Sequence, residues 1–372
     1  MTAPNPDNRI LCLVSNCIPV KGSRRSLIAD LDRNEFRLIP NSLYELLIQY
    51  NKHTVSEIRN AFPDSEQVTL TDYFSFLEQH EYIFRVDTID EAALFPPLNL
   101  KWDYPCIISN AIVDIGIYSK HPYESIFIQL QELGCKDIQI RCYHPLPLPE
   151  LEVILHYLDE SRFKSIDLIF PYTSANDPGS FLALACKFPR IRSAFIYASP
   201  VEEVLYAGED TNTGVFYFTT QLVPDEHRCG VVDARYFTVN TQLFTEAKKY
   251  NTCLNRKLSI DQYGEIRNCP SMEASFGHCS DTRLADAVEY PGFKDYWQIS
   301  KDRIRTCSDC EFRYICVDCR AYLETPSDTF SKPLKCGYNP YTAEWEDWST
   351  HPLKEKARLH YGFSADPAES QV

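Results

Sequence analysis

The sequence lacks long apolar segments and lacks an excess of positive charge. No uninterrupted apolar run approaches the roughly 18–20 residues that a membrane-spanning helix needs. Residues 1–8 are polar and contain neither the basic nor the apolar part of a secretion signal. The formal net charge is −15, and an acidic surface repels phosphate backbones and anionic lipid headgroups. We therefore expect a cytoplasmic protein whose main partner is neither a nucleic acid nor a membrane.

Cysteine, in contrast, is abundant, with 15 residues in the chain. The cytoplasm keeps thiols reduced, so a disulfide framework is not expected, and metal ligation becomes the leading use of clustered cysteines. Six scattered cysteines stand among apolar neighbours and are expected to fill cores as small apolar side chains. They are Cys12, Cys17, Cys106, Cys135, Cys142 and Cys186.

Length and patterning predict a mixed α/β protein of several units. A chain of 372 residues with 44% apolar content can form two or three domains with real cores. We expect a small N-terminal module, a linker, a partial parallel β/α barrel and a cysteine-rich C-terminal domain. Their boundaries are predicted at 9–86, 87–105, 106–240 and 241–350.

The N-terminal module has the pattern of a hairpin and three short helices. Apolar runs at 26–31 and 35–39 predict the hairpin. Helix start signals stand at Ser42, at Thr54, and at Thr69 or Thr71. This set of elements is typical of a winged helix, but no helix is rich enough in Lys and Arg for a DNA-reading helix. The region resembles the recognition element of peptide-maturing enzymes, in which the leader of a precursor peptide adds a strand. A purely structural N-terminal domain is the alternative.

Strands and helices alternate after the proline-rich linker. Strand patterns begin near 107, 137, 165 and 190, and helical patterns at 122–133, 149–158 and 181–188 lie between them. This alternation predicts right-handed β-α units around a parallel sheet. Residues 106–220 suffice for about half of an eight-fold barrel, so an open or partial barrel is expected.

Three polar residues follow predicted strands of this region. Asp114, His144 and Tyr172 would lie near the carboxyl ends of the strands, where ligands of such sheets bind. For any one of them, however, a role as a loop or capping residue is the favoured interpretation.

The last third of the chain contains eight cysteines between 253 and 336, and seven of them follow a closely spaced pattern. Two Cys-x2-Cys pairs lie between Cys307 and Cys319, and Cys310 is separated from Cys316 by only five residues. A single zinc site usually has its two pairs roughly 12–20 residues apart, so this spacing is cramped for one tetrahedral ion. Two interleaved metal centres are favoured, as in ferredoxins that share ligands between neighbouring clusters.

The full pattern resembles a known domain. Cys253-x10-Gly264-x4-Cys269, then the two pairs, then Cys336, is similar to the SPASM domain. That domain carries auxiliary iron–sulfur clusters in radical AdoMet enzymes that modify peptides. The usual last spacing is Cys-x3-Cys, whereas this chain has Cys-x2-Cys. The segments 255–261, 268–272, 310–316 and 319–322 look like the peptide maturases of grasp-with-spasm systems, which work with an ATP-grasp ligase.

The resemblance implies two [4Fe–4S] clusters, with zinc as the alternative metal. The ligands of the first cluster would include Cys253, Cys269 and Cys319. Those of the second would be Cys307, Cys310, Cys316 and Cys336. The candidate for the fourth ligand of the first cluster is Cys229, in a loop upstream of the domain. Cys279, His278 or an open coordination position are the alternatives.

One motif of the radical AdoMet enzymes is missing. They carry Cys-x3-Cys-x2-Cys after the first barrel strand, but residues 110–122 contain no cysteine and the motif occurs nowhere in the chain. An AdoMet cluster and conventional radical AdoMet chemistry are therefore not expected, and whether the chain is an enzyme stays open.

Two functions follow from these observations. The first is a maturation protein for a ribosomally synthesised peptide, which binds the precursor leader and works with an ATP-grasp ligase. The second is a non-catalytic scaffold, stabilised by zinc or iron–sulfur clusters, that binds a peptide or protein. Metal content and precursor binding distinguish them.

Overall fold

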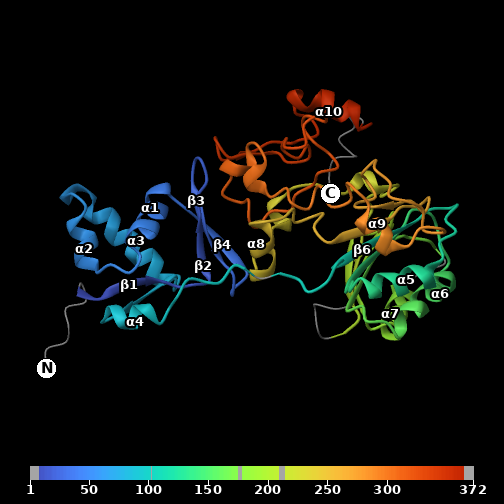
Figure 1. Cartoon of the computed structure of the whole chain (residues 1–372), viewed down its shortest axis with the longest axis horizontal. Coiled ribbons are helices and arrows are strands. Elements are labelled where there is room, and N and C mark those ends of the chain that lie inside the picture. Colours follow the sequence, from blue (N-terminus) through green and yellow to red (C-terminus); the bar gives the residue numbers. More distant parts are fainter. Residues whose placement is uncertain (1–7, 102, 175–177, 209–213, 364–372) are drawn as a thin grey trace.

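The protein is elongated, with a small N-terminal module at one end and a large sheet at the other (Figure 1). The computed structural model describes residues 8–101, 103–174, 178–208 and 214–363. No helix within these ranges is both long enough and apolar enough to span a bilayer.

The N-terminal module contains two small antiparallel sheets and three helices. Its five strands are β1 (Ile10–Leu13), β2 (Cys17–Val20), β3 (Ser26–Asp30), β4 (Glu35–Ile39) and β5 (Ile83–Val86). Its helices are α1 (Asn41–Tyr50), α2 (Val55–Asn60) and α3 (Gln67–Gln79). Strand β1 pairs with β5, while β2, β3 and β4 form a three-stranded sheet that contains the expected hairpin. Asn34 has a φ of 57° in the turn of that hairpin.

The predicted helix caps are right at one position and wrong at two. Thr54 and Glu57 form a complete capping box at the start of α2. Helix α1 instead follows Pro40 without a side-chain cap, and the Ser42 hydroxyl pairs with that of Tyr73. Helix α3 begins at Gln67, upstream of both Thr69 and Thr71, so these threonines lie inside the helix. Start signals within a helix-rich region identify the helices but not their first residues.

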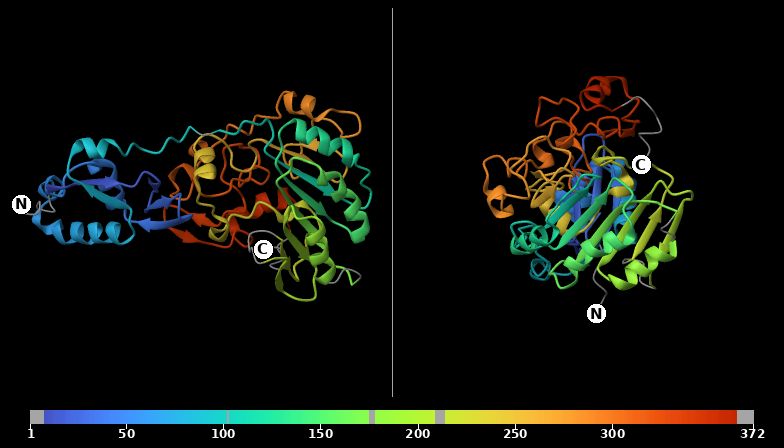
Figure 2. Two further views of the ribbon diagram at one scale, coloured as in Figure 1. Left: turned by 90° about the horizontal axis from the view of Figure 1, so that it is seen from below. Right: turned by 90° about the vertical axis from the view of Figure 1, so that its right-hand side faces the viewer.

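The segment expected as a linker contains one short helix. Helix α4 (Ile89–Ala93) begins at a capping box formed by Thr88 and Glu91. The described residues from 94 to 109 contain neither helix nor strand. They run along the molecule from the N-terminal module to the large sheet (Figure 2).

The large sheet has eight strands in the order β10-β11-β9-β8-β7-β6-β12-β13. The strands are β6 (Asn110–Ile115), β7 (Asp137–Cys142), β8 (Ser165–Pro171), β9 (Ile191–Tyr197), β10 (Glu203–Tyr206), β11 (Val215–Phe218), β12 (Lys257–Ile260) and β13 (Ile266–Arg267). The six inner strands are parallel, and β10 and β13 are antiparallel edge strands. The two edges do not pair with each other in the described part of the chain, so the sheet is open.

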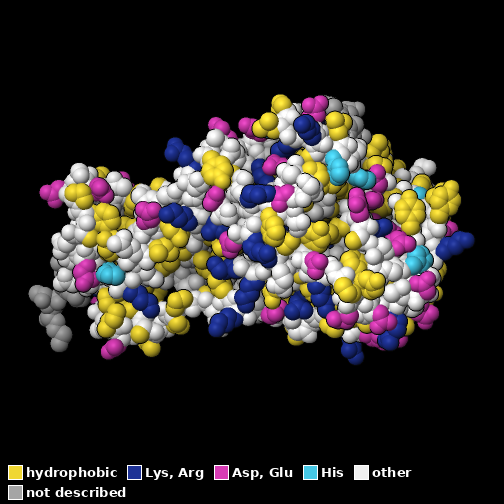
Figure 3. Space-filling model, turned by 45° about the horizontal axis from the view of Figure 1, so that its top comes forward, with side chains coloured by type: hydrophobic (Ala, Val, Ile, Leu, Met, Phe, Trp, Pro, Cys, Tyr) yellow, Lys and Arg dark blue, Asp and Glu magenta, His cyan; other side chains and the backbone are white. Residues whose placement is uncertain are grey.

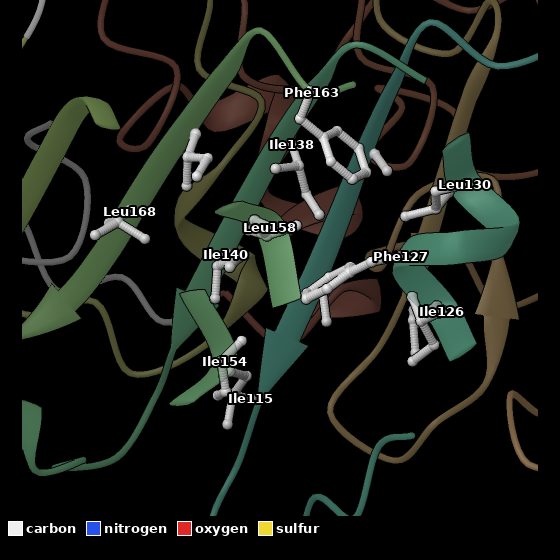
Figure 4. Packing of buried hydrophobic residues seen from close by; sticks show 14 of the residues in the cluster. Ile115, Ile126, Phe127, Leu130, Ile138, Ile140, Ile154, Leu158, Phe163 and Leu168 are labelled. Atoms are coloured by element: carbon white, nitrogen blue, oxygen red, sulfur yellow. The ribbon is translucent and has the colours of Figure 1, made fainter. Parts of the chain in front are cut away.

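Three helices cover one face of this sheet. They are α5 (Tyr123–Glu132), α6 (Leu148–Asp159) and α7 (Pro178–Lys187), and they lie together on one side (Figure 1). Phe127 and Leu158 from the helices pack against Ile138 and Ile140 of β7 in the main core (Figure 4). Burial of these alternate strand residues leaves the intervening ones, such as Gln139 and Arg141, on the opposite face.

The cysteine-rich region contributes to the sheet as well as forming its own unit. Strand β12 runs parallel to β6, with Lys257 opposite Asn110, although the two strands are far apart in sequence. The rest of the region is mainly irregular. Its regular elements are α8 (Thr241–Ala247), α9 (Leu284–Glu289), β14 (Tyr338–Asn339), β15 (Glu344–Trp345) and α10 (Glu355–His360).

Six 3₁₀ turns complete the secondary structure of the described residues. They are Asp64–Glu66, Glu226–Arg228, Ala234–Tyr236, Lys301–Arg303, Cys307–Asp309 and Pro352–Lys354. Two of them directly adjoin candidate metal ligands, because Cys229 follows the second turn and Cys307 begins the fifth.

The surface charge is unevenly distributed despite the acidic balance of the chain. Figure 3 shows Lys and Arg side chains gathered over the middle of one face, between the N-terminal module and the large sheet. The overall charge of −15 therefore does not describe this face.

Candidate metal centres and the adjoining cavity

The first group of thiols combines four segments of the chain. It consists of Cys229, Cys253, Cys269 and Cys319. Cys269 interacts electrostatically with the other three thiols, and Cys319 interacts with Cys229 and Cys253. We call this set the first thiol group. Burial raises the pKa of Cys319 to about 12, so metal coordination is the means by which such a thiol would be held as a thiolate.

The backbone of the loop that contains Cys229 packs closely against the first thiol group. Gly230 has a φ of 84°, and a Cβ atom there would lie 2.8 Å from the Cys319 sulfur. A side chain at this position would strain the backbone and strike the neighbouring thiol. The close approach brings Cys229 beside ligands that follow it by many residues in the chain.

Lys335 holds the same loop from the other side. Its ammonium group donates hydrogen bonds to the carbonyl oxygens of Cys229, at 3.0 Å, and of His227. The Val232 amide donates to the Lys335 carbonyl oxygen at 3.1 Å. Burial among aromatic rings, which include Phe363 at 4.4 Å, lowers the pKa of Lys335 to about 8.

The two alternative ligands are engaged elsewhere. The ring nitrogens of His278 are hydrogen-bonded to Ser280 and to the carbonyl oxygen of Tyr263. Cys279 lies in the main core, with its sulfur 3.9 Å from Nδ1 of His121. Burial raises the pKa of Cys279 to about 11. Of the candidates for the fourth position, Cys229 is therefore the one that the fold brings to the first thiol group.

The second thiol group consists of Cys307, Cys310, Cys316 and Cys336. All four line one small cavity, together with Lys301 and Lys332. Burial raises the pKa of Cys307 to about 11 and that of Cys316 to about 12, although the Lys301 charge opposes both shifts. These four thiols are the ones that the resemblance assigns to a second cluster.

Among the described residues, neither thiol group places three of its sulfurs within 4.8 Å of one another. Within the described ranges, one set of three or more candidate ligands has all its ligand atoms within 4.8 Å of one another, and it is Asp225, Glu226 and His227. No three cysteine sulfurs in that part of the chain therefore lie within this distance of one another. The distance between the sulfurs determines whether zinc or an iron–sulfur cluster fits the site.

The sheet of the N-terminal module rests directly on the second thiol group. Val20 and Leu27 share an apolar cluster with Phe312, Cys316 and Cys336. The loop between β2 and β3 also contacts the cysteine-rich region, since the Ser23 amide donates to the carbonyl oxygen of Asp309 at 2.7 Å. The second thiol group thus lies in an interface between the N-terminal module and the cysteine-rich region.

A partly buried ion pair lies in this interface. Arg25 Nε donates to Glu311 Oε1 at 2.8 Å, and the Glu311 side chain is fully buried. Tyr338 also donates its hydroxyl to Glu311. A carboxylate buried this deeply needs these partners, because an unpaired charge in an apolar environment costs several kcal/mol.

A cavity of about 350 Å³ lies between the first thiol group and the face of the large sheet that α5, α6 and α7 do not cover, which we call the uncovered face. Cys229 and Arg228 line it on one side, and Arg141, Ile169 and Phe195 of the sheet line it on the other. A cavity of this size is in the range of small ligand sites. The first thiol group therefore borders a space that the second does not.

Arg141, which lines this space, forms an ion pair with Asp114. Arg141 donates two hydrogen bonds to the Asp114 carboxylate, at 2.6 and 2.7 Å, and both side chains are buried. Burial raises the pKa of Asp114 to about 6, while the guanidinium opposes the shift. Asp114 is thus a paired residue within β6 and not a loop or capping residue.

The other two residues that we expected near the carboxyl ends of the strands are His144 and Tyr172. His144 has a buried Nδ1 atom without a hydrogen-bond partner, and Tyr172 packs against the main core. Neither lines the cavity of Cys229. Arg141 and Tyr143 also line this cavity and were not predicted. Polar residues alternate with apolar ones from 137 to 143, which indicates a sheet face that helices do not cover.

No protein-family model and no curated protein matches the chain. Among solved structures, SuiB of Streptococcus suis bound to S-adenosylmethionine gives a TM-score of 0.36 at 10% identity, covering 87% of this chain and 98% of SuiB. A second crystal structure of SuiB gives a TM-score of 0.35 at 10% identity, with the same coverage. SuiB bound to its precursor peptide SuiA gives 0.36 at 9% identity, again with the same coverage.

Proposed function

We propose that this protein is a maturation protein for a ribosomally synthesised peptide. In this proposal the N-terminal module binds the precursor leader, and the two thiol groups hold iron–sulfur clusters. The peptide is presented to the cavity beside Cys229 or to a partner ATP-grasp ligase. The observation that carries the proposal is the convergence of eight cysteines into two separate groups of four behind a module that resembles a peptide-recognition element.

The donor sets fit [4Fe–4S] clusters better than zinc. A tetrahedral zinc ion with Zn–S bonds of about 2.3 Å requires sulfurs about 3.8 Å apart. No three cysteine sulfurs of the described residues lie within even 4.8 Å of one another. A [4Fe–4S] cluster binds each thiolate through a different iron atom, so it needs the wider spacing. When bound, such clusters supply electron transfer or a metal site that can bind a substrate thiolate.

The loop after β6 supports the view that conventional radical AdoMet chemistry is absent. This loop contains no cysteine between 110 and 122. Ser119 instead donates a hydrogen bond of 2.6 Å to the carbonyl oxygen of Gln262 in the β12–β13 turn. The loop that carries the missing motif in radical AdoMet enzymes is therefore used here to contact the cysteine-rich region.

Metal analysis and peptide binding together test this proposal. Protein purified without oxygen should contain about eight iron and eight sulfide per chain and no stoichiometric zinc. The labelled precursor peptide encoded beside this gene should bind in a fluorescence-anisotropy titration. Failure to bind at tens of micromolar, or stoichiometric zinc without sulfide, would contradict it.

A second candidate function is a metal-stabilised scaffold that binds a peptide or protein without catalysis. The burial of the second thiol group beneath the N-terminal sheet favours it, because a metal there would mainly stabilise the fold. This candidate predicts that metal removal unfolds the interface and that the bound precursor is never altered in mass.

A further inference from the structure

The uncovered face of the large sheet has an exposed apolar area at its open edge. Val204 of β10 and Tyr217 of β11 stand directly opposite each other and are 45% and 43% exposed. Edge strands of soluble proteins are usually protected by charged residues, proline or bulges. Strand β10 has the sequence Glu-Val-Leu-Tyr, with one charged residue, and Tyr206 is 50% exposed.

This exposed pair is the end of a row that crosses the sheet. In the strand register Tyr217 lies opposite Phe195, and Phe195 lies opposite Ile169. We call Val204, Tyr217, Phe195 and Ile169 the apolar row. The next residue in the same register is Arg141, which is paired with Asp114.

The row leads from solvent into the cavity of the first thiol group. Phe195, Ile169 and Arg141 line that cavity together with Cys229. Leu222, which is 62% exposed, lines the same cavity and widens the apolar surface at its mouth. The exposed half and the enclosed half of the row are thus one continuous surface.

The dimensions of the row fit an extended peptide. Its four residues span three strand spacings of about 4.8 Å each, or about 14 Å. An extended chain covers this length with about four residues. A second copy of the protein could pair with the β10 edge, but it would not occupy the enclosed end beside Cys229. The continuity with the cavity therefore favours a flexible peptide as the occupant.

We propose that the apolar row binds the part of the precursor peptide that follows the leader. This segment lies extended across the row, contacts it through aromatic or aliphatic side chains, and places the next residue in the cavity beside Cys229. The proposal rests on the function proposed above and adds a specificity to it. A precursor with charged residues at these positions would be rejected, because they would be desolvated against Phe195 and Ile169.

A matched pair of substitutions tests the row. Tyr217→Asp places a charge on it, and Tyr157→Asp places the same charge on the opposite side, on α6, where the tyrosine is also 43% exposed. Fluorescence anisotropy should show about a tenfold weaker binding of the full precursor to Y217D, with leader-only binding unchanged. Y157D should bind both peptides as the unmodified protein does. Iron content and Tm measured on both variants verify that they fold.

A cross-linking experiment identifies the occupant directly. Benzoylphenylalanine placed at Val204 should form an adduct with the segment that follows the leader, as read by peptide mass spectrometry. An adduct between two protein chains, or equal binding of the full precursor to Y217D and to the unmodified protein, would overturn the assignment of the row. If neither the leader nor the full precursor binds the unmodified protein, the proposed function fails as well.

Discussion

Each of the two thiol groups consists of four cysteines, but the two groups occupy different environments. The first includes Cys229, which belongs to a loop, is partly exposed and borders a cavity of about 350 Å³. The second lies beneath the N-terminal sheet, where Cys316 and Cys336 are part of an apolar cluster. The difference indicates that a metal at the first group would be accessible to a peptide, whereas one at the second would stabilise the fold.

The largest effect is expected from a substitution in the second group. Cys316→Ser should remove one ligand, lower the iron content by about half and lower Tm by more than about 10 °C, because metal binding there is coupled to packing of the interface. Cys186→Ser, at an exposed cysteine, serves as the control. Thermal unfolding under anaerobic conditions and iron analysis provide the measurement, and an unchanged Tm would show that the second group is not structural.

The interface itself can be weakened without changing a cysteine. Arg25→Met removes the partner of the fully buried Glu311 and should cost about 2 kcal/mol, less than a fully buried pair because Arg25 is partly exposed. Hydrogen exchange should become faster in β2, β3 and β4. Arg37→Met, which disrupts only an exposed pair with Glu35, should cost less than about 0.5 kcal/mol. Equal effects of the two variants would argue against the interface.

Lys335 offers a test of how the first group is held. Lys335→Met keeps the side-chain length but removes the hydrogen bonds to the carbonyl oxygens of His227 and Cys229, at an expected cost of about 1–2 kcal/mol. The Cys229 loop should then release iron faster to a chelator, visible as decay of the iron–sulfur absorbance. Lys294→Met, at an exposed ion pair, is the control. Identical rates of iron release would mean that Lys335 does not position the loop.

The smallest effect on stability is expected at Cys229. Cys229→Ser should alter the electron paramagnetic resonance spectrum of the reduced first cluster, while Tm falls by no more than about 3 °C because the residue is only partly buried. The spectrum of the second cluster should persist. If Tm falls as far as in Cys316→Ser, the contrast between an accessible and a structural group is wrong.

Local patterns predicted the elements well where packing follows the chain. The alternation of strands and helices from 107 to 197 corresponds to β6–β9 and α5–α7, since apolar periodicity directly reflects burial on one face. The hairpin of β3 and β4 and the capping box at Thr54 were also correct. Helix starts at Ser42 and at Thr69 or Thr71 were wrong, because polar residues inside a helix can mimic a cap.

Partners that are distant in the chain could not be predicted in this way. The pairing of β12 with β6 leaves no local sign, because a parallel pairing depends on packing and not on a connecting turn. The Asp114–Arg141 ion pair has the same origin, as the two residues come from neighbouring strands. Arg25 and Glu311 are 286 positions apart in the chain, and nothing in either segment indicates the other.

Cysteine spacing from 253 to 336 predicts a metal-binding region, because closely spaced thiols have few other uses in a reduced protein, and metal binding there stays a prediction. Whether iron–sulfur clusters occupy it stays a prediction. Only the tertiary structure shows that the first thiol group borders a cavity at Cys229 and that the second lies in a buried interface. Lys335, Gly230 and the N-terminal sheet make that division through contacts between segments that the chain keeps far apart.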